Sequence, residues 1–105
     1  MSTITVSIGR NVGTEPMSEN EWFSFREAIK CAVKFTDHQI LFTGDGEGIW
    51  EGQKEDAYTI VAMTVADTNG KMGSDTAWLR DWAGRLGRKY GQDAVAITTG
   101  ETDLV

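Results

Sequence analysis

Polar and apolar residues alternate strictly over residues 3–8, which predicts a half-buried β-strand near the start of the chain. Ile4, Val6 and Ile8 fall on one face of this strand, and small hydroxyl residues fall on the other. Further apolar runs predict three more strands, the middle one apolar on both faces and therefore typical of a central strand: residues 38–43, 57–65 and 94–99.

Two segments carry apolar side chains at the three- and four-residue spacing of an amphipathic helix. The first helix is expected at residues 19–34, because Ser18 and Glu21 form a capping box at its start. The second helix is expected to begin after Ser74 or Asp75, either of which can act as its N-cap.

Glycines and polar residues predict loops between these elements, at residues 10–16, 44–48 and 67–73. The middle segment holds three glycines, and we expect a flexible connection there rather than a phosphate-binding loop, because no helix follows it. The resulting order is β-α-β-β-α-β. It predicts an α+β fold, a single ferredoxin-like domain over residues 1–105 with two helices on one face of an antiparallel sheet.

The face of the sheet away from the helices is expected to carry small or mixed side chains: Thr3, Thr5, Ser7, Tyr58, Ile60, Ala94, Ala96 and Thr98. A solvated sheet face would carry more Lys and Glu, so we predict that a second copy of the chain covers it and forms a homo-oligomer. Tyr58 and the threonines would then line a ligand pocket between the copies.

Several short patterns stand in a characteristic order from the first strand to the last: residues 9–11, 16–18 with Trp22 and Phe25, and residues 46–52, 55–56 and 90–95. In this order and spacing the chain resembles a group of short proteins from bacteria and bacteriophages that has no assigned activity. The resemblance implies a compact α+β domain, often carried by phages, and it implies no reaction and no catalytic residues.

The chain is acidic, with 16 Asp and Glu against 10 Lys and Arg, a net charge of −6 and a pI of about 4.6. This balance makes a nucleic-acid partner unexpected, because nucleic-acid binding needs a basic face. No apolar run approaches the ~20 residues that span a bilayer, so no membrane role is expected. A single cysteine makes no internal disulfide, and we expect a cytoplasmic protein, in the host cytoplasm if it is phage-encoded.

Five acidic residues fall within twelve positions: Asp45, Glu47, Glu51, Glu55 and Asp56. Their spacing does not match a calcium-binding EF-hand, so the favoured interpretation is a solvated acidic surface, which could dock on a basic partner. Trp50 lies inside this segment. We expect it to pack back onto the edge of the core, and the alternative is an exposed interface anchor.

Arg10 and Asn11 follow the first strand, and Gln92 and Asp93 precede the last. These strands are antiparallel neighbours in a ferredoxin-like fold, so the two segments should meet at one end of the sheet. The favoured interpretation is an ion pair between Arg10 and Asp93. Alternatively, Arg10, Asn11 and Gln92 form a polar rim for a small anionic ligand.

The second predicted helix is basic, with cations near its C-terminal end where the helix dipole favours them: Arg80, Arg85, Arg88 and Lys89. A small anion or a partner is the alternative role for this cluster. Cys31 and His38 are the only Cys and His, but nothing evident would orient them as a catalytic pair. A zinc site would need carboxylates for most of its ligands, so we predict no catalytic residues, no metal and no cofactor.

These observations lead to a non-enzymatic, phage-type accessory protein that acts as an oligomer, by blocking a host factor or by sequestering a ligand. The residues expected to bind the partner or ligand are Arg10, Asn11, Trp50, Glu51, Glu55, Tyr58, Gln92 and Asp93. Three alternatives stay open: a sponge for a nucleotide-like signal with a basic pocket, a small enzyme on a dimeric ferredoxin-like scaffold, and a virion-associated structural protein.

Overall fold

A computed structural model describes residues 1–66 and 73–105. The elements follow in the order β1 (Ser2–Gly9), β2 (Asn11–Val12), β3 (Glu15–Pro16), α1 (Glu19–Phe35), β4 (His38–Trp50), β5 (Gln53–Thr64), α2 (Thr76–Lys89) and β6 (Ala96–Glu101). The loop expected at residues 67–73 lies outside the described residues except for Gly73. Within the described ranges, neither helix is long and apolar enough to span a bilayer.

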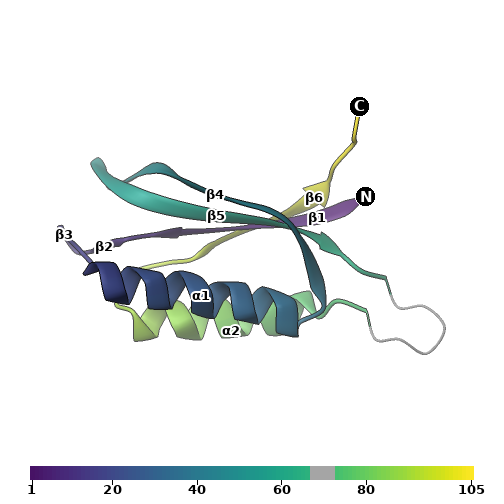
Figure 1. Ribbon diagram of the computed structural model, residues 1–105, viewed down its shortest axis with the longest axis horizontal. Helices are drawn as coiled ribbons and strands as arrows, with labels where there is room; N and C mark the ends of the chain where they lie inside the picture. Colours follow the sequence, from purple (N-terminus) through teal and green to yellow (C-terminus); the bar gives the residue numbers. More distant parts are fainter. Residues whose placement is uncertain (67–72) are drawn as a thin grey trace.

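Four strands form one antiparallel sheet in the order β4-β5-β1-β6, and both helices cover the same face of it (Figure 1). This is the expected ferredoxin-like arrangement, with the first and third long strands, β1 and β5, in the centre. The expected loop at residues 10–16 contains one addition, the short hairpin of β2 and β3.

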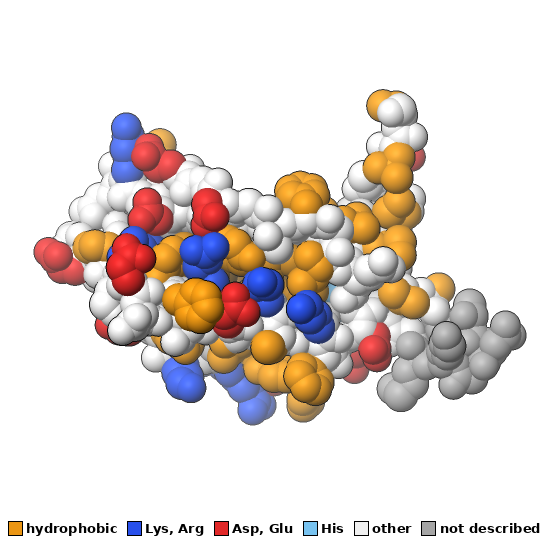
Figure 2. Space-filling model, in the orientation of Figure 1, with side chains coloured by type: hydrophobic (Ala, Val, Ile, Leu, Met, Phe, Trp, Pro, Cys, Tyr) orange, Lys and Arg blue, Asp and Glu red, His pale blue; other side chains and the backbone are white. Residues whose placement is uncertain are grey.

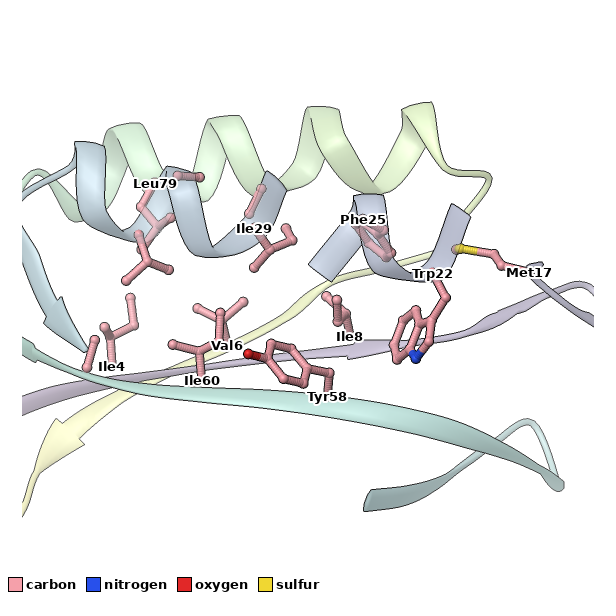
Figure 3. Packing of buried hydrophobic residues seen from close by; sticks show 14 residues of the cluster. Ile4, Val6, Ile8, Met17, Trp22, Phe25, Ile29, Tyr58, Ile60 and Leu79 are labelled. Carbon is pink, nitrogen blue, oxygen red and sulfur yellow. The ribbon is translucent and has the colours of Figure 1, made fainter. Parts of the chain in front are cut away.

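The core lies between the sheet and the two helices (Figure 3). Ile4, Val6 and Ile8 point into it from β1, as their alternation predicts. Tyr58 and Ile60 also point into it, which contradicts their expected place on the open face. The physical reason is the register: Val6 pairs with Ile60 and Ile8 with Tyr58, and directly paired residues share a face of the sheet.

The first helix begins where its capping residues predict. Ser18 is the N-cap, and its Oγ accepts a hydrogen bond from the backbone N–H of Glu21 at 3.2 Å. The second helix is capped by Asp75, one of the two expected residues, which accepts from the backbone N–H of Trp78 at 2.9 Å. Both helices therefore begin at positions that the local sequence specifies.

The glycine-rich segment at residues 44–48 is not a loop, because β4 runs without a break through it to Trp50. Each of its residues pairs with one of β5, and the backbone hydrogen bonds of this ladder hold the strand although its three glycines have no side chain to pack. Glu51 and Gly52 make the turn, with φ of 50° and 78°. Because β1 ends at Gly9, opposite Ala57, the tip of this hairpin extends beyond the central strand.

Candidate functional site

A pocket of about 330 Å³ lies where the β4–β5 hairpin extends past the end of β1. Its walls come from the hairpin, from β1 and the segment after it, and from the connection between α2 and β6. The polar and charged side chains that line it are Ser7, Asn11, Thr14, Glu51, Gln53, Glu55, Gln92 and Asp93. Trp50 and Ile49 supply the large apolar surface.

Backbone contacts hold the carboxylate of Glu55 in the pocket. Its Oε2 accepts a hydrogen bond from the backbone N–H of Asn11 at 2.8 Å, and its carboxylate lies against Gly9, where no Cβ intervenes. The backbone oxygen of Asn11 in turn accepts from Nε2 of Gln92 at 2.7 Å. The segments after β1 and before β6 therefore meet at one end of the sheet, and their contact holds Glu55 in place.

Trp50 is the last residue of β4, and 48% of its surface is exposed. The expectation that it packs onto the edge of the core is wrong. Asp45 of β4 pairs with Tyr58, which faces the helices, and strand alternation places Trp50 on the opposite, open face. The indole Nε1 donates to Oδ2 of Asp93 at 3.4 Å. This contact connects the hairpin tip to the α2–β6 connection and orients the ring at the pocket.

Three carboxylates line the pocket, those of Glu51, Glu55 and Asp93. None of the three forms an ion pair with a Lys or Arg of the described residues, and no Lys or Arg is among the residues described as lining the pocket. In residues 1–66 and 73–105 no three His, Cys, Asp or Glu converge as a metal-binding group. The pocket thus holds three carboxylates that no described Lys or Arg neutralises, which suits a cationic ligand.

Arg10 does not belong to the pocket, and the expected ion pair with Asp93 is not formed. Its guanidinium donates to the backbone oxygen of Met17 at 2.8 Å, to Asp56 at 3.0 Å and to Glu19 at 3.2 Å. These partners lie on β5, at the first residue of α1 and in the segment that leads into α1, so Arg10 has a structural role. Among residues 1–66 and 73–105, the basic pocket that a nucleotide-like signal would need is not assembled, because the cations of α2 lie on the helix layer.

Tyr58 also lies outside the pocket, since it faces the helices. Arg26 of α1 lies over the Tyr58 ring at 4.3 Å from its centroid, and it forms an ion pair with Asp45 of β4 at 3.0 Å. Arg26 therefore fastens the hairpin to α1 from the helix side, leaving the opposite face free to form the pocket.

His38 and Cys31 are separated by their surroundings. His38 is buried, and its two ring nitrogens contact Thr36 Oγ1 at 2.9 Å and Thr76 Oγ1 at 3.1 Å. Burial lowers the pKa of His38 below its ordinary value, although Asp37 and Asp75 act in the opposite direction. Cys31 is exposed on α1, so the two residues do not form a nucleophile–base pair.

Sequence reasoning placed Ser7 and Ala96 on the open face but assigned them to no ligand site. The lining residues that it missed altogether include Gly9, Thr14, Gly48, Gln53 and Ala57. Gly44, Gly46 and Gly48 recur at every second position, which is the period of one face of a strand. That periodicity is the signal by which a flat wall of small residues could have been predicted in place of a loop.

No protein-family model matches this chain, and no curated protein matches it. Two solved structures of a phage SAM lyase have a similar fold. The apo structure aligns with a TM-score of 0.65 and 18% sequence identity, over 94% of this chain and 78% of that one. The complex with S-methyl-5′-thioadenosine aligns with a TM-score of 0.57 and 19% identity, over 95% and 80% of the two chains.

Both neighbours are named as an enzyme, which overturns our expectation of a non-enzymatic binding protein. Among the alternatives, they favour a small enzyme on a ferredoxin-like scaffold. One neighbour also holds a small nucleoside ligand.

Proposed function

We propose that this chain is a small enzyme that binds S-adenosylmethionine and breaks its carbon–sulfur bond, releasing S-methyl-5′-thioadenosine. The observation that carries the proposal is the pocket itself: a cavity with an aromatic wall is lined by three carboxylates that form no ion pair with a Lys or Arg in the part of the chain that the structure describes. A ligand with an ammonium group and a net positive charge matches these carboxylates, and its adenine ring matches Trp50. The shared fold of a phage SAM lyase supports the same assignment.

Cleavage of the carbon–sulfur bond requires different properties of the carboxylate residues and of the apolar residues that line the pocket. When the bond between sulfur and the aminocarboxypropyl chain breaks, sulfur keeps the electron pair and loses its positive charge. The carbon that leaves sulfur either forms a bond to an oxygen of its own carboxylate, which closes a lactone, or forms a double bond to the neighbouring carbon as that carbon loses a proton to a base. A carboxylate beside the sulfonium would hold the substrate more firmly than the transition state, in which that charge is disappearing.

We therefore assign Glu55 and Asp93 to the ammonium and hydroxyl groups of the ligand, which keep their character throughout the reaction. The indole of Trp50 and the small residues of β1 and β5 surround the adenosyl group and the sulfur. A weakly polar environment favours the dispersal of the sulfonium charge as the bond breaks.

The experiment is to incubate the purified protein with S-adenosylmethionine and to follow methylthioadenosine by liquid chromatography and mass spectrometry. We expect product to accumulate with enzyme concentration, and Glu55→Gln to lower kcat/KM by about 100-fold, a typical loss for a positioning hydrogen bond to a charged group. Glu47→Gln is the matched control: it makes the same change in the same hairpin, but Glu47 pairs with Lys54 outside the pocket. Absence of product above the spontaneous rate would overturn the proposal.

We also propose that the protein acts as a homo-oligomer through the open sheet face, as a phage-type protein in the host cytoplasm. Phe42 is 59% exposed on β4, directly opposite Val61 of β5, and this apolar pair supports a covered face. Both structural neighbours are phage proteins, which supports the proposal of a phage-type protein in the host cytoplasm. Light scattering coupled to size exclusion tests the assembly: Phe42→Glu should shift an oligomer to monomer, and a monomeric native protein contradicts it.

A further inference from the structure

The helix layer has a charge opposite to that of the whole molecule. Together α1 and α2 carry seven Lys or Arg side chains and four Asp or Glu, a net charge of +3. Because the chain as a whole carries −6, the remaining residues carry −9. In Figure 2, basic and hydrophobic side chains gather over the helices, whereas most acidic side chains lie toward the hairpin end. The charge is thus segregated between two regions of one small molecule.

Exposed aromatic rings lie at one end of this basic layer. Phe35 at the end of α1 is 76% exposed, and Trp78 in the first turn of α2 is 55% exposed. Both rings contact Trp82, with centroid distances of 5.9 Å from Phe35 and 6.5 Å from Trp78. Trp82 is itself partly buried against the core, so it anchors two exposed rings at the surface of the helix pair. Two large exposed rings this close together are unusual for a surface that meets only water.

The aromatic cluster continues directly into cations. Trp78, Trp82, Arg85 and Lys89 stand at intervals of four, three and four residues, which places them along one stripe of α2. The two helices run antiparallel, because Phe35 meets Trp82 at one end and Phe25 stacks on Tyr90 at the other. The outer surface is therefore a helix pair with an aromatic end and a basic end.

We propose that this surface of α1 and α2 docks an acidic amphipathic helix of a partner protein. The apolar side chains of that helix would cover Phe35, Trp78 and Trp82, and its carboxylates would pair with Arg85, Lys89 and the neighbouring cations. Two antiparallel helices present a groove into which a third helix packs at ordinary interhelical distance. The surface is separate from the carboxylate-lined pocket, which lies on the opposite side of the sheet.

The charges favour a protein partner over other anionic surfaces. Asp81 forms an ion pair with Arg85 at 3.0 Å, and Glu27 with Lys30 at 3.5 Å, so acids are interspersed among the cations of the layer. A nucleic acid or an anionic bilayer requires a continuous basic field, and a net charge of −6 repels a long polyanion. A short acidic helix makes local pairs and buries the aromatic rings as well.

The test uses a synthetic 20-residue helical peptide with Leu on one face and Glu on the others, titrated into ¹⁵N-labelled protein. We expect amide shifts confined to the C-terminal turn of α1 and to α2. Trp78→Ala and Arg85→Glu should each weaken binding by about ten-fold, the loss of one good contact at an interface. Lys54→Glu is the matched control, since its side chain is 76% exposed on the hairpin, and it should leave affinity within about two-fold.

Several outcomes would overturn the proposal. These are no shift at millimolar peptide, shifts on the hairpin only, or equal binding of a peptide with Lys in place of Glu. Tighter binding of a (dT)20 oligonucleotide or of phosphatidylglycerol vesicles at 0.15 M salt would assign the surface to another class of ligand. Self-association that Arg85→Glu abolishes would assign it to a second copy. Formation of methylthioadenosine should be unchanged in Arg85→Glu. A failure of the docking proposal can therefore be distinguished from a failure of the proposed enzyme activity.

Discussion

The carboxylate of Glu55 lies against Gly9, in the space that a Cβ atom on Gly9 would occupy. A residue with a side chain at position 9 would force Glu55 away from the backbone N–H of Asn11, to which it is bonded at 2.8 Å. Glycine is thus needed here for close approach rather than for an unusual backbone angle.

Gly9→Ala should therefore displace Glu55 and lower kcat/KM for S-adenosylmethionine cleavage by about ten-fold or more, while stability falls by about 1 kcal/mol, the net value of one hydrogen bond. The amide proton of Asn11 should move upfield in the NMR spectrum as its carboxylate partner is lost. Gly46→Ala is the control, because a Cβ at Gly46 meets nothing within 4 Å. An unchanged Asn11 resonance in Gly9→Ala would contradict this account.

Trp50 should contribute to ligand affinity through its ring. Trp50→Ala is expected to weaken binding of methylthioadenosine by about ten-fold or more, since stacking of a base on an aromatic ring contributes ~1–3 kcal/mol. Trp50→Phe keeps a ring and should retain most of the affinity. Calorimetry measures both, with Trp78→Ala on the helix layer as the control. Equal affinities in Trp50→Ala and the native protein would remove the ring from the site.

Arg10 should matter for stability and not for ligand binding. Its side chain is only 15% exposed and donates to three different acceptors. Arg10→Lys keeps the charge but cannot reach all three, so the free energy of unfolding should fall by roughly 1–2 kcal/mol. Urea unfolding measures this loss, and KM for S-adenosylmethionine should stay within about two-fold. A selective rise in KM would restore the alternative in which Arg10 contacts the ligand.

His38 should make the protein less stable in mild acid. Burial lowers the pKa of its imidazole below the ordinary value of 6.5, so the unfolded chain binds the proton first as the pH falls. The stability is fully present above about pH 6.5 and is lost progressively as the pH falls toward the folded-state pKa. Each unit of lowering corresponds to about 1.4 kcal/mol.

The measurement is urea unfolding of the native protein and of His38→Gln between pH 7.5 and pH 4.5. The native protein should lose more stability over this range than the variant, whose side chain does not titrate. The comparison concerns the slope of the unfolding free energy against pH. A variant that is less stable by the same amount at every pH can therefore still be used. Parallel slopes would show that His38 takes no proton on unfolding in this range.

The fold followed from local signals that need no knowledge of the rest of the chain. Alternation over residues 3–8 predicted β1, and Ser18 with Glu21 predicted the start of α1. Three further strands and a second helix in the right order were then enough for the ferredoxin-like topology. Such signals work because backbone period and capping depend on neighbouring residues alone.

The candidate site depended on contacts between distant segments. Arg10 could reach Asp93 or Asp56, and only the packed position of α1 and β5 selects Asp56 and leaves Asp93 to Trp50. Tyr58 was assigned to the wrong face because a strand with apolar residues on both faces has no alternation to show which side is buried.

The β4–β5 hairpin is the clearest case in which local sequence does not determine the secondary structure and tertiary contacts do. Three glycines within residues 44–48 have low intrinsic preference for a strand, and taken alone they predict a loop. They form a strand because β5, anchored in the centre of the sheet by β1, offers a complete row of hydrogen-bonding partners. Short-range patterns therefore specify the elements and their order, while partner strands decide how far an element extends and which side chains meet, since those hydrogen bonds and contacts form only between segments far apart in the chain.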